Sequence, residues 1–130
     1  MKNKLNTDEI ILLAGAGGMV GKAIFRALKK HNYGCNINGG KILTPKRKDV
    51  DFSDNLQTKN WFIKNKPSIV IIAAAKVGGI LSNKNFPADF ILENLKIQTN
   101  IIEESWKCGV KRLLFLGSSC IYPKYSSQPI

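Results

Sequence analysis

Three glycines join a short apolar run to an amphipathic stretch near the start of this 130-residue chain. Ile10 to Ala14 is typical of a buried strand, and Met19 to Lys30 has apolar residues at helical spacing. Between them we expect Gly15 to permit a tight turn, Gly18 to let backbone approach a diphosphate, and Gly21 to let the helix pack on the sheet. N–H groups at a helix start attract phosphate. The spacing and its context therefore predict a dinucleotide site; the alternative is an ordinary strand–helix turn.

Apolar runs and amphipathic stretches continue to alternate along the chain. Further strands are predicted at 41–44, 69–73 and 112–116, and further helices from a cap at Ser53 or Asp54 to 64 and from 85 to 107. The expected inward residues are Leu56, Phe62 and Ile63 in the first of these helices and Phe90, Asn94, Ile97, Ile101 and Ser105 in the second. Apolar strands separated by helices imply a parallel sheet covered on both faces.

We therefore predict an α/β fold, a Rossmann-like doubly wound parallel sheet of order 3-2-1-4 that is truncated after the fourth strand. Residues 1–130 are expected to form a single, incomplete NAD(P)-binding domain without its C-terminal strands and substrate domain. The fourth strand would then be an unprotected apolar edge, from which we expect aggregation or edge-to-edge pairing.

The residues after the second predicted strand bear on which dinucleotide is bound. Lys46, Arg47 and Lys48 precede the first carboxylate, Asp49. A basic group here favours a ribose 2′-phosphate, and a guanidinium grips phosphate in a fork, so Arg47 is the best candidate. This predicts NADP, with NAD still possible; the alternative is a basic surface loop. Met19 and Val20, inside the glycine turn, are counted with the cofactor site.

The ends of the third and fourth predicted strands also carry candidate site residues. Ala73, Ala74 and Ala75 are small enough for a nicotinamide ribose to lie against the backbone, or they reflect close packing. Ser118 can hydrogen-bond a substrate carbonyl or hydroxyl, and Cys120 could move a proton if its pKa is lowered. A polar turn is the alternative.

Three segments resemble the GDP-L-fucose synthases, which are extended short-chain dehydrogenase/reductases. They are Ala-Ala-Ala-Lys-Val-Gly-Gly-Ile from Ala73, Pro-Ala-Asp-Phe-Ile from Pro87 and Leu-Gly-Ser-Ser-Cys-Ile-Tyr-Pro-Lys from Leu116. The resemblance implies an NADP-dependent epimerase/reductase that converts GDP-4-keto-6-deoxy-D-mannose to GDP-L-fucose. It also implies roles for four residues: catalytic serine for Ser118, epimerisation cysteine for Cys120, cofactor contact for Asn94 and adenine contact for Asp54.

The chain departs from the family pattern at several positions. Neither Tyr122 nor Tyr125 is followed four residues later by the lysine of the family's Tyr-x-x-x-Lys pair. Gly17 and Pro45 stand where the family often has arginines for the 2′-phosphate. We therefore expect no turnover by this polypeptide alone. Another nucleotide-sugar epimerase or dehydratase and a non-catalytic nucleotide-binding fragment remain alternatives.

The net charge of +11 raises the question of a nucleic-acid partner. The lysines are scattered and no nucleic-acid motif accompanies them, so we expect a solvated basic surface. No apolar run approaches the ~20 residues of a membrane helix. Three cysteines in no zinc or disulfide pattern favour a reducing cytoplasm and no metal site. The expected partners are a GDP-sugar and either a second copy, as in a family-like homodimer, or a missing C-terminal half.

Overall fold

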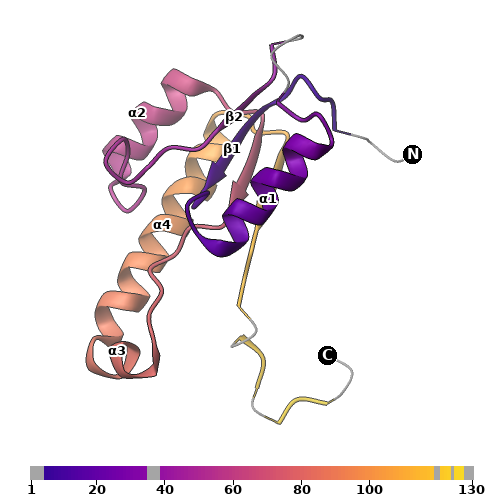
Figure 1. Cartoon of the computed structure of the whole chain (residues 1–130). Helices are drawn as coiled ribbons and strands as arrows, with labels where there is room; N and C mark the ends of the chain where they lie inside the picture. Colours follow the sequence, from indigo (N-terminus) through magenta and orange to yellow (C-terminus); the bar gives the residue numbers. More distant parts are fainter. Residues whose placement is uncertain (1–4, 35–38, 119–120, 124, 128–130) are drawn as a thin grey trace.

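One four-stranded sheet with helices on both faces forms the body of the molecule (Figure 1). The computed structural model describes residues 5–34, 39–118, 121–123 and 125–127. The strands are β1 (Ile10–Ala14), β2 (Lys41–Leu43), β3 (Ile69–Ile72) and β4 (Arg112–Phe115). The helices are α1 (Met19–Lys30), α2 (Asn55–Asn65), α3 (Ile80–Asn85) and α4 (Pro87–Lys107).

All strand pairs are parallel, and the strand order is β2-β1-β3-β4. The predicted doubly wound parallel sheet is therefore confirmed, but the predicted order 3-2-1-4 is wrong. Leu12 of β1 pairs with Leu43 of β2 on one side and with Val70 of β3 on the other. The third strand thus lies beside β1 and not beyond β2.

The placement of α2 explains this order. It packs with α4 on one face of the sheet, whereas α1 covers the opposite face (Figure 1). The connection from β2 through α2 to β3 is a crossover between parallel strands, and such crossovers are right-handed. With α2 on the face opposite to α1, a right-handed crossover places β3 on the side of β1 away from β2. The winding direction consequently reverses between β1 and β3. A reversal of this kind is the point at which open α/β sheets bind ligands.

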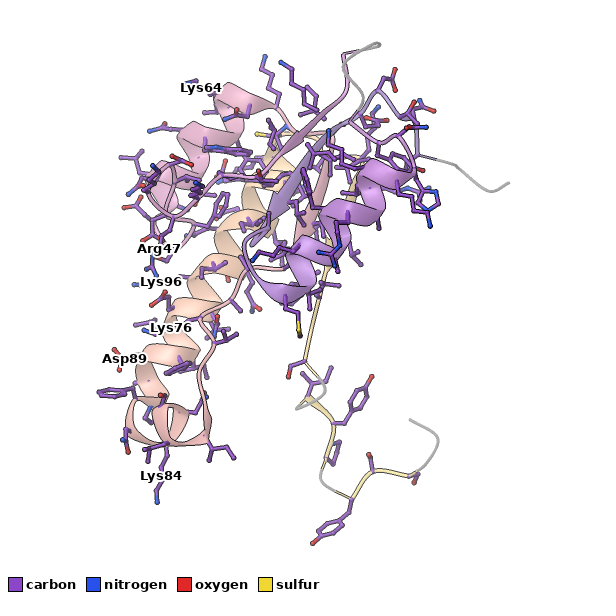
Figure 2. The ribbon with its side chains drawn as sticks, viewed as in Figure 1. Arg47, Lys64, Lys76, Lys84, Asp89 and Lys96 are labelled. Atoms are coloured by element: carbon purple, nitrogen blue, oxygen red, sulfur yellow. The ribbon has the colours of Figure 1, made fainter. Side chains whose placement is uncertain are left out.

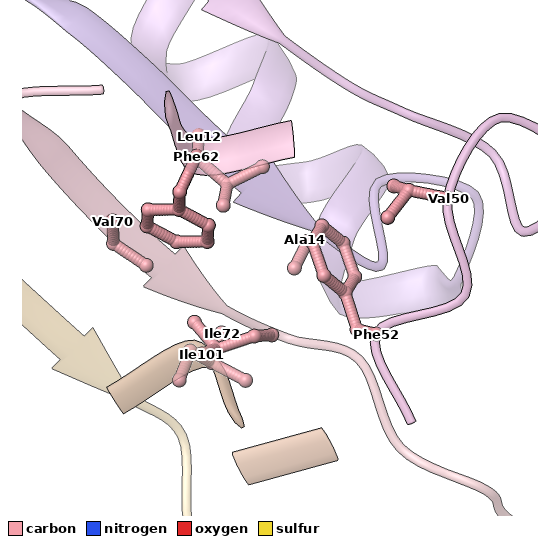
Figure 3. Packing of buried hydrophobic residues seen from close by; sticks show 8 residues of the cluster. All are labelled: Leu12, Ala14, Val50, Phe52, Phe62, Val70, Ile72 and Ile101. Atoms are coloured by element: carbon pink, nitrogen blue, oxygen red, sulfur yellow. The ribbon is translucent and has the colours of Figure 1, made fainter. Parts of the chain in front are cut away.

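Successive residues of the strands point alternately into two separate cores. Leu12, Ala14, Val70 and Ile72 face α2 and α4, where they pack with four more apolar side chains (Figure 3). Those four are Val50, Phe52, Phe62 and Ile101. Ile11, Leu13, Ile69 and Ile71 face α1 and meet its half-buried residues Ile24, Phe25 and Leu28. Both faces of the sheet are therefore covered at β1 and β3, as the continuous apolar strands indicate.

The inward face of α2 differs from the sequence prediction. Phe62 is fully buried, but Leu56 and Ile63 are 65% and 53% exposed. Thr58 takes the expected apolar place, and its hydroxyl donates to the main-chain oxygens of Asp54 at 2.7 Å and Phe52 at 3.3 Å. A buried hydroxyl satisfied in this way is tolerated in a core, so apolarity alone was a poor guide to the orientation of this helix.

The other elements match the prediction closely. On α4, Phe90, Asn94 and Ile97 are half-buried, and Ile101 and Ser105 are buried, so the predicted face is confirmed. The short helix α3 was not predicted, and β2, β3 and β4 each end one residue earlier than expected. No helix among the described residues has the length and apolar character needed to cross a membrane.

Strand β4 is an exposed apolar edge. Leu113, Leu114 and Phe115 are all more than a third exposed, and among the described strands β4 pairs only with β3. An open apolar edge offers unpaired backbone groups to another chain. Pairing or aggregation through β4 stays a prediction.

At the amino ends of the strands, a buried carboxylate ties β1 to the start of β4. Glu9 is 7% exposed, and its two oxygens accept from the Lys111 ammonium at 2.9 and 3.1 Å. The pKa of Glu9 lies below the ordinary glutamate value, because the polar Ser68 hydroxyl and the Lys111 ammonium beside the carboxylate favour its ionised form. The ion pair therefore stabilises the folded chain above the unfolded-state value of about 4.3 and is lost as the pH falls through the lower folded value.

We expect Glu9→Gln to lower the free energy of unfolding by about 1–3 kcal/mol at neutral pH, because it removes the charge that faces Lys111. The difference from wild type should shrink toward zero as the pH falls below about 4. Urea unfolding at several pH values measures both effects. Glu103→Gln is the control: Glu103 pairs with Lys107 on the surface, where the two side chains are 43% and 44% exposed, so this variant should change stability far less. A deficit independent of pH would contradict the ionic explanation.

Candidate nucleotide-binding site

A cleft of about 1000 Å³ opens at the carboxyl ends of β1 and β3. Its lining residues lie in segment 15–21 between β1 and α1, segment 44–52 after β2 and segment 73–77 after β3. Glu93 and Ile97 of α4 complete the wall. The cleft thus occupies the switch point of the sheet, where this class of fold places its ligands.

Two glycines let the first turn pack against neighbouring backbone. Gly15 has a φ of +86°, and a Cβ there would overlap the carbonyl group of Ala73 at the end of β3. A Cβ on Gly21 would overlap the carbonyl oxygen of Gly15 and lie 2.8 Å from Cα of Ala16. Only glycine has neither the conformational penalty nor the extra atom, so the helix can begin directly against the sheet.

The start of α1 opens into the cleft without a side-chain cap. Gly18 is the N-cap residue, and Lys22 donates from its backbone N–H to the Gly18 oxygen at 2.9 Å. Gly18 has no side chain to accept from the first N–H groups of the helix, and the first turn carries no acidic residue. The first N–H groups of a helix lack intrahelical acceptors and carry the positive end of its dipole. The arrangement suits an anion.

An apolar wall lies beside this turn. Val50, Phe52, Ala74 and Ile97 line it, and Phe52 packs edge-on against Trp61 with ring centroids 5.9 Å apart. The side-chain amide of buried Asn100 donates to the Phe52 carbonyl at 2.9 Å and fixes this segment against α4. A flat, partly apolar ligand group can be accommodated here.

A chain of ion pairs crosses the outer side of the cleft. Arg47 contacts Asp51 through Nη2 at 3.3 Å and Glu93 through Nη1 at 3.0 Å, and the other oxygen of Glu93 accepts from Lys76 at 2.9 Å. Figure 2 shows Arg47 and Lys76, from the segments after β2 and β3, along the same side of the molecule as α4. Hydrogen bonds from Ser53 to Asp51 and from Lys76 to Glu93 are the first causes that hold both carboxyl pKa values below their ordinary range.

The segment after β3 is held in place by Asn94 of α4. Its amide oxygen accepts from the Lys76 backbone N–H at 2.7 Å, and its amide nitrogen donates to the Lys76 carbonyl at 3.0 Å. One side chain thus satisfies both backbone groups of a residue that lines the cleft. Asn94 supports the wall from behind and is not among the residues that line it.

Asn94→Asp should lower the free energy of unfolding by about 1–2 kcal/mol, because a carboxylate oxygen replaces the donor that faces the Lys76 carbonyl. The deficit should shrink when the introduced carboxyl is protonated, below about pH 4. Chemical unfolding at neutral and acidic pH measures it. The matched control is Asn83→Asp, whose amide bonds the exposed Gly78 and Gly79 carbonyls and should matter less. An equal loss of stability in both variants would contradict the proposed role of Asn94 in holding the segment after β3 in place.

The structure brings most of the predicted cofactor residues together. The predicted residues that line the cleft are Gly15, Gly18, Met19, Val20, Gly21, Arg47, Ala73, Ala74 and Ala75. Asp54 is not among the lining residues, because its carboxylate caps α2 by accepting from the Gln57 N–H at 2.8 Å. Ser118 is not among the lining residues either. The segment that follows β4 runs away from the sheet (Figure 1). Cys120 lies outside the described residues.

Among the charged or aromatic residues that line the cleft, Asp51, Phe52, Lys76 and Glu93 were not predicted as site residues. Asp51 and Phe52 occupy the place expected for Asp54, and Glu93 joins from α4. The sequence did offer a signal for Asp51 and Phe52, because an acidic residue followed by an apolar one stands just before the predicted helix cap. Nothing in the local sequence distinguishes Glu93 from other helix carboxylates.

The sequence matches the model of the NAD dependent epimerase/dehydratase family over residues 11–130. The chain belongs to this family. The match covers the strands, the glycine turn and every wall of the cleft. All the features of the candidate dinucleotide site described above therefore lie within the family match. The sequence motifs after β3 and β4 lie inside the same match.

Within the epimerase/dehydratase family, the resemblance to GDP-L-fucose synthases is confirmed. The chain is 48% identical over 120 residues to the GDP-L-fucose synthase of Sinorhizobium fredii (strain NBRC 101917 / NGR234), covering 92% of this chain and 36% of that protein. It is 40% identical to the GDP-L-fucose synthase of Escherichia coli (strain K12), with the same coverage. The chain therefore spans about a third of the length of these relatives.

Solved structures of family relatives share the fold. A GDP-L-fucose synthetase from Naegleria fowleri bound to NADP superposes with a TM-score of 0.81 at 32% identity, over 98% of this chain and 36% of that one. A GDP-mannoheptose C4 reductase from Campylobacter jejuni with NADP bound gives 0.87 at 31% identity, over 98% and 38%. The Rossmann-like architecture is thus common to all three.

Proposed function

We propose that the cleft binds NADP(H), as the cofactor-binding part of a reductase or epimerase that acts on a GDP-sugar. The observation that carries the proposal is the uncapped start of α1, which opens into a cleft at the switch point of the sheet. The diphosphate would accept from the N–H groups at Met19 and Val20, and the adenine would lie near Phe52. Arg47 is the candidate for the 2′-phosphate.

The proposed activity of the whole protein is conversion of GDP-4-keto-6-deoxy-D-mannose to GDP-L-fucose. Relatives at 40–48% identity are named for this product. NADPH would supply hydride for reduction of the sugar ketone. In this chain, Ser118 is proposed to donate a hydrogen bond to that carbonyl, and Cys120 to exchange a proton on a carbon beside it.

A second candidate is reduction of a different GDP-keto-sugar. Three Campylobacter jejuni enzymes named for GDP-heptoses superpose with TM-scores of 0.85 to 0.87, against 0.80 and 0.81 for the Naegleria fowleri synthetase. The identities, 31% and 32%, do not separate the two groups. The two candidates share the cofactor cleft and differ in the sugar, so they make the same prediction for NADP(H).

A cytoplasmic site of action and a homodimer are also part of the proposal. An exposed apolar stripe on α4 supports the dimer, with Ile91, Leu95, Ile102 and Trp106 at helical spacing. Analytical ultracentrifugation of the chain tests this part. Monomer at all concentrations would contradict it and would leave the cofactor proposal intact.

Calorimetric titration with NADPH and NADH tests the cofactor proposal. We expect saturable binding of both, tighter for NADPH, because Arg47 offers a charged fork to the additional phosphate. Duplex DNA at the same ionic strength should bind more weakly. Tighter binding of DNA than of NADPH would overturn the proposal in favour of a charge-driven nucleic-acid surface. We expect no GDP-fucose from this polypeptide, since none of its tyrosines is followed four residues later by lysine.

A further inference from the structure

Glu93 is the one described carboxylate that pairs with both Arg47 and Lys76. Its oxygens lie 3.0 Å from the Arg47 guanidinium and 2.9 Å from the Lys76 ammonium. Arg47 belongs to the segment after β2 and Lys76 to the segment after β3, so the carboxylate on α4 links two walls of the cleft. The side chain of Glu93 is 19% exposed, whereas that of Arg47 is 69% exposed.

The charges of this cluster cancel. Two cations, Arg47 and Lys76, meet two carboxylates, Asp51 and Glu93. The Lys76 hydrogen bond holds the pKa of Glu93 below its ordinary value, so the carboxylate is ionised at neutral pH. A phosphate that approaches Arg47 therefore meets a guanidinium whose positive charge is already paired with the carboxylates of Asp51 and Glu93.

The two carboxylates differ in how readily they can release Arg47. Asp51 lies four residues along the same segment and is fixed by the Ser53 N–H at 2.9 Å and the Ser53 hydroxyl at 2.7 Å. Glu93 would keep its Lys76 partner if the guanidinium left. If a phosphate oxygen replaces Glu93 as a partner of Arg47, no buried charge is therefore left unpaired. An unpaired buried charge would be costly.

We propose that Glu93 determines the choice between the two dinucleotides by competing with the ribose 2′-phosphate for Arg47. This inference rests on the proposed binding of NADP(H) in the cleft. The carboxylate lowers the affinity for a 2′-phosphorylated ligand and leaves the affinity for an unphosphorylated one nearly unchanged. Glu93 is thus a specificity-determining residue that acts through Arg47.

The test is Glu93→Gln, titrated with NADPH and NADH in the calorimeter. Glutamine keeps the length and one oxygen acceptor but removes the charge about 3 Å from the guanidinium. We expect NADPH to bind roughly three- to tenfold more tightly than to wild type, and NADH to change by less than about twofold. The gain should fall at high salt, because the cluster is partly exposed.

Two further variants isolate the effect. Glu103→Gln makes the same change on the same helix at the Lys107 pair, which does not line the cleft, and should alter neither affinity. In an Arg47→Gln background, Glu93→Gln should bring no gain for NADPH, because the group under competition is absent. Thermal melting of each variant checks that the fold is kept.

If Glu93→Gln raised the affinity for NADPH and NADH equally, or lowered the affinity for NADPH, the proposed competition between Glu93 and the 2′-phosphate would be wrong. A gain that persists in the Arg47→Gln background would overturn the role of Arg47 in it. Absence of binding of either nucleotide to wild type and to Glu93→Gln would overturn the proposed function itself, and the specificity role with it.

Discussion

Gly21→Ala should lower the free energy of unfolding by about 2–4 kcal/mol, with a fall in Tm on the order of 10 °C. The added Cβ would overlap the carbonyl oxygen of Gly15 and crowd Cα of Ala16, and both are backbone atoms that cannot rotate away. Alanine is otherwise favoured over glycine in a helix by about 1 kcal/mol. The sign of the change therefore decides whether the close approach of α1 to the turn controls stability.

Gly17→Ala is the matched control in the same turn. A Cβ at Gly17 meets no atom within 4 Å, and its φ lies outside the left-handed range. We expect Tm to stay within about 2 °C of wild type. Differential scanning calorimetry of the two variants is sufficient. A stabilised Gly21→Ala protein, or equal losses in both variants, would contradict the packing argument.

Gly18→Val should weaken NADPH binding at least about tenfold while Tm changes little. Gly18 has φ −74° and ψ 172°, an extended conformation that valine adopts readily, and its Cβ would touch only the Gly15 oxygen at an ordinary 3.6 Å. The side chain would stand beside the first N–H groups of α1, where the proposed diphosphate lies. The cost should therefore appear in binding and not in folding.

Gly79→Val provides the control for this variant. Gly79 caps α3 with nearly the same conformation, φ −69° and ψ 173°, and a Cβ there meets no atom within 4 Å. It does not line the cleft. Calorimetry with NADPH should give the wild-type affinity for Gly79→Val. Equal losses at both positions would mean that the effect comes from disturbed helix caps and not from an occupied anion site.

The sequence patterns identified most of the fold because the strands are short continuous apolar runs and two of the long helices have strong periodicity. α1 and β1 begin and end at the predicted residues, and the inward face of α4 is as predicted. The strand order could not be read in this way. It depends on which face of the sheet α2 covers, and its buried Thr58 gives no apolar signal for that face.

The candidate site was foreseen where one segment determines the chemistry. The glycine turn does so, because its spacing, the preceding strand and the following helix all lie within residues 10–30. Arg47 was foreseen, but its partner Glu93 lies 46 positions away and reaches it only through the packing of α4. The sequence prediction assigned Asp54 to the cleft, but Asp51, three residues earlier, lines the cleft and Asp54 caps α2. Only the folded start of the helix shows which of the two carboxylates becomes the cap.

The central claim is that backbone amides at the start of α1 hold a dinucleotide diphosphate. Backbone amide chemical-shift mapping of the isotope-labelled chain, titrated with NADPH, tests it most directly. We expect the largest changes at Gly18, Met19 and Val20, smaller ones at Ala73 to Ala75, and none at Lys64 on α2. Shifts confined to the lysine-bearing surface away from the cleft, or no shifts at a saturating nucleotide concentration, would contradict the account.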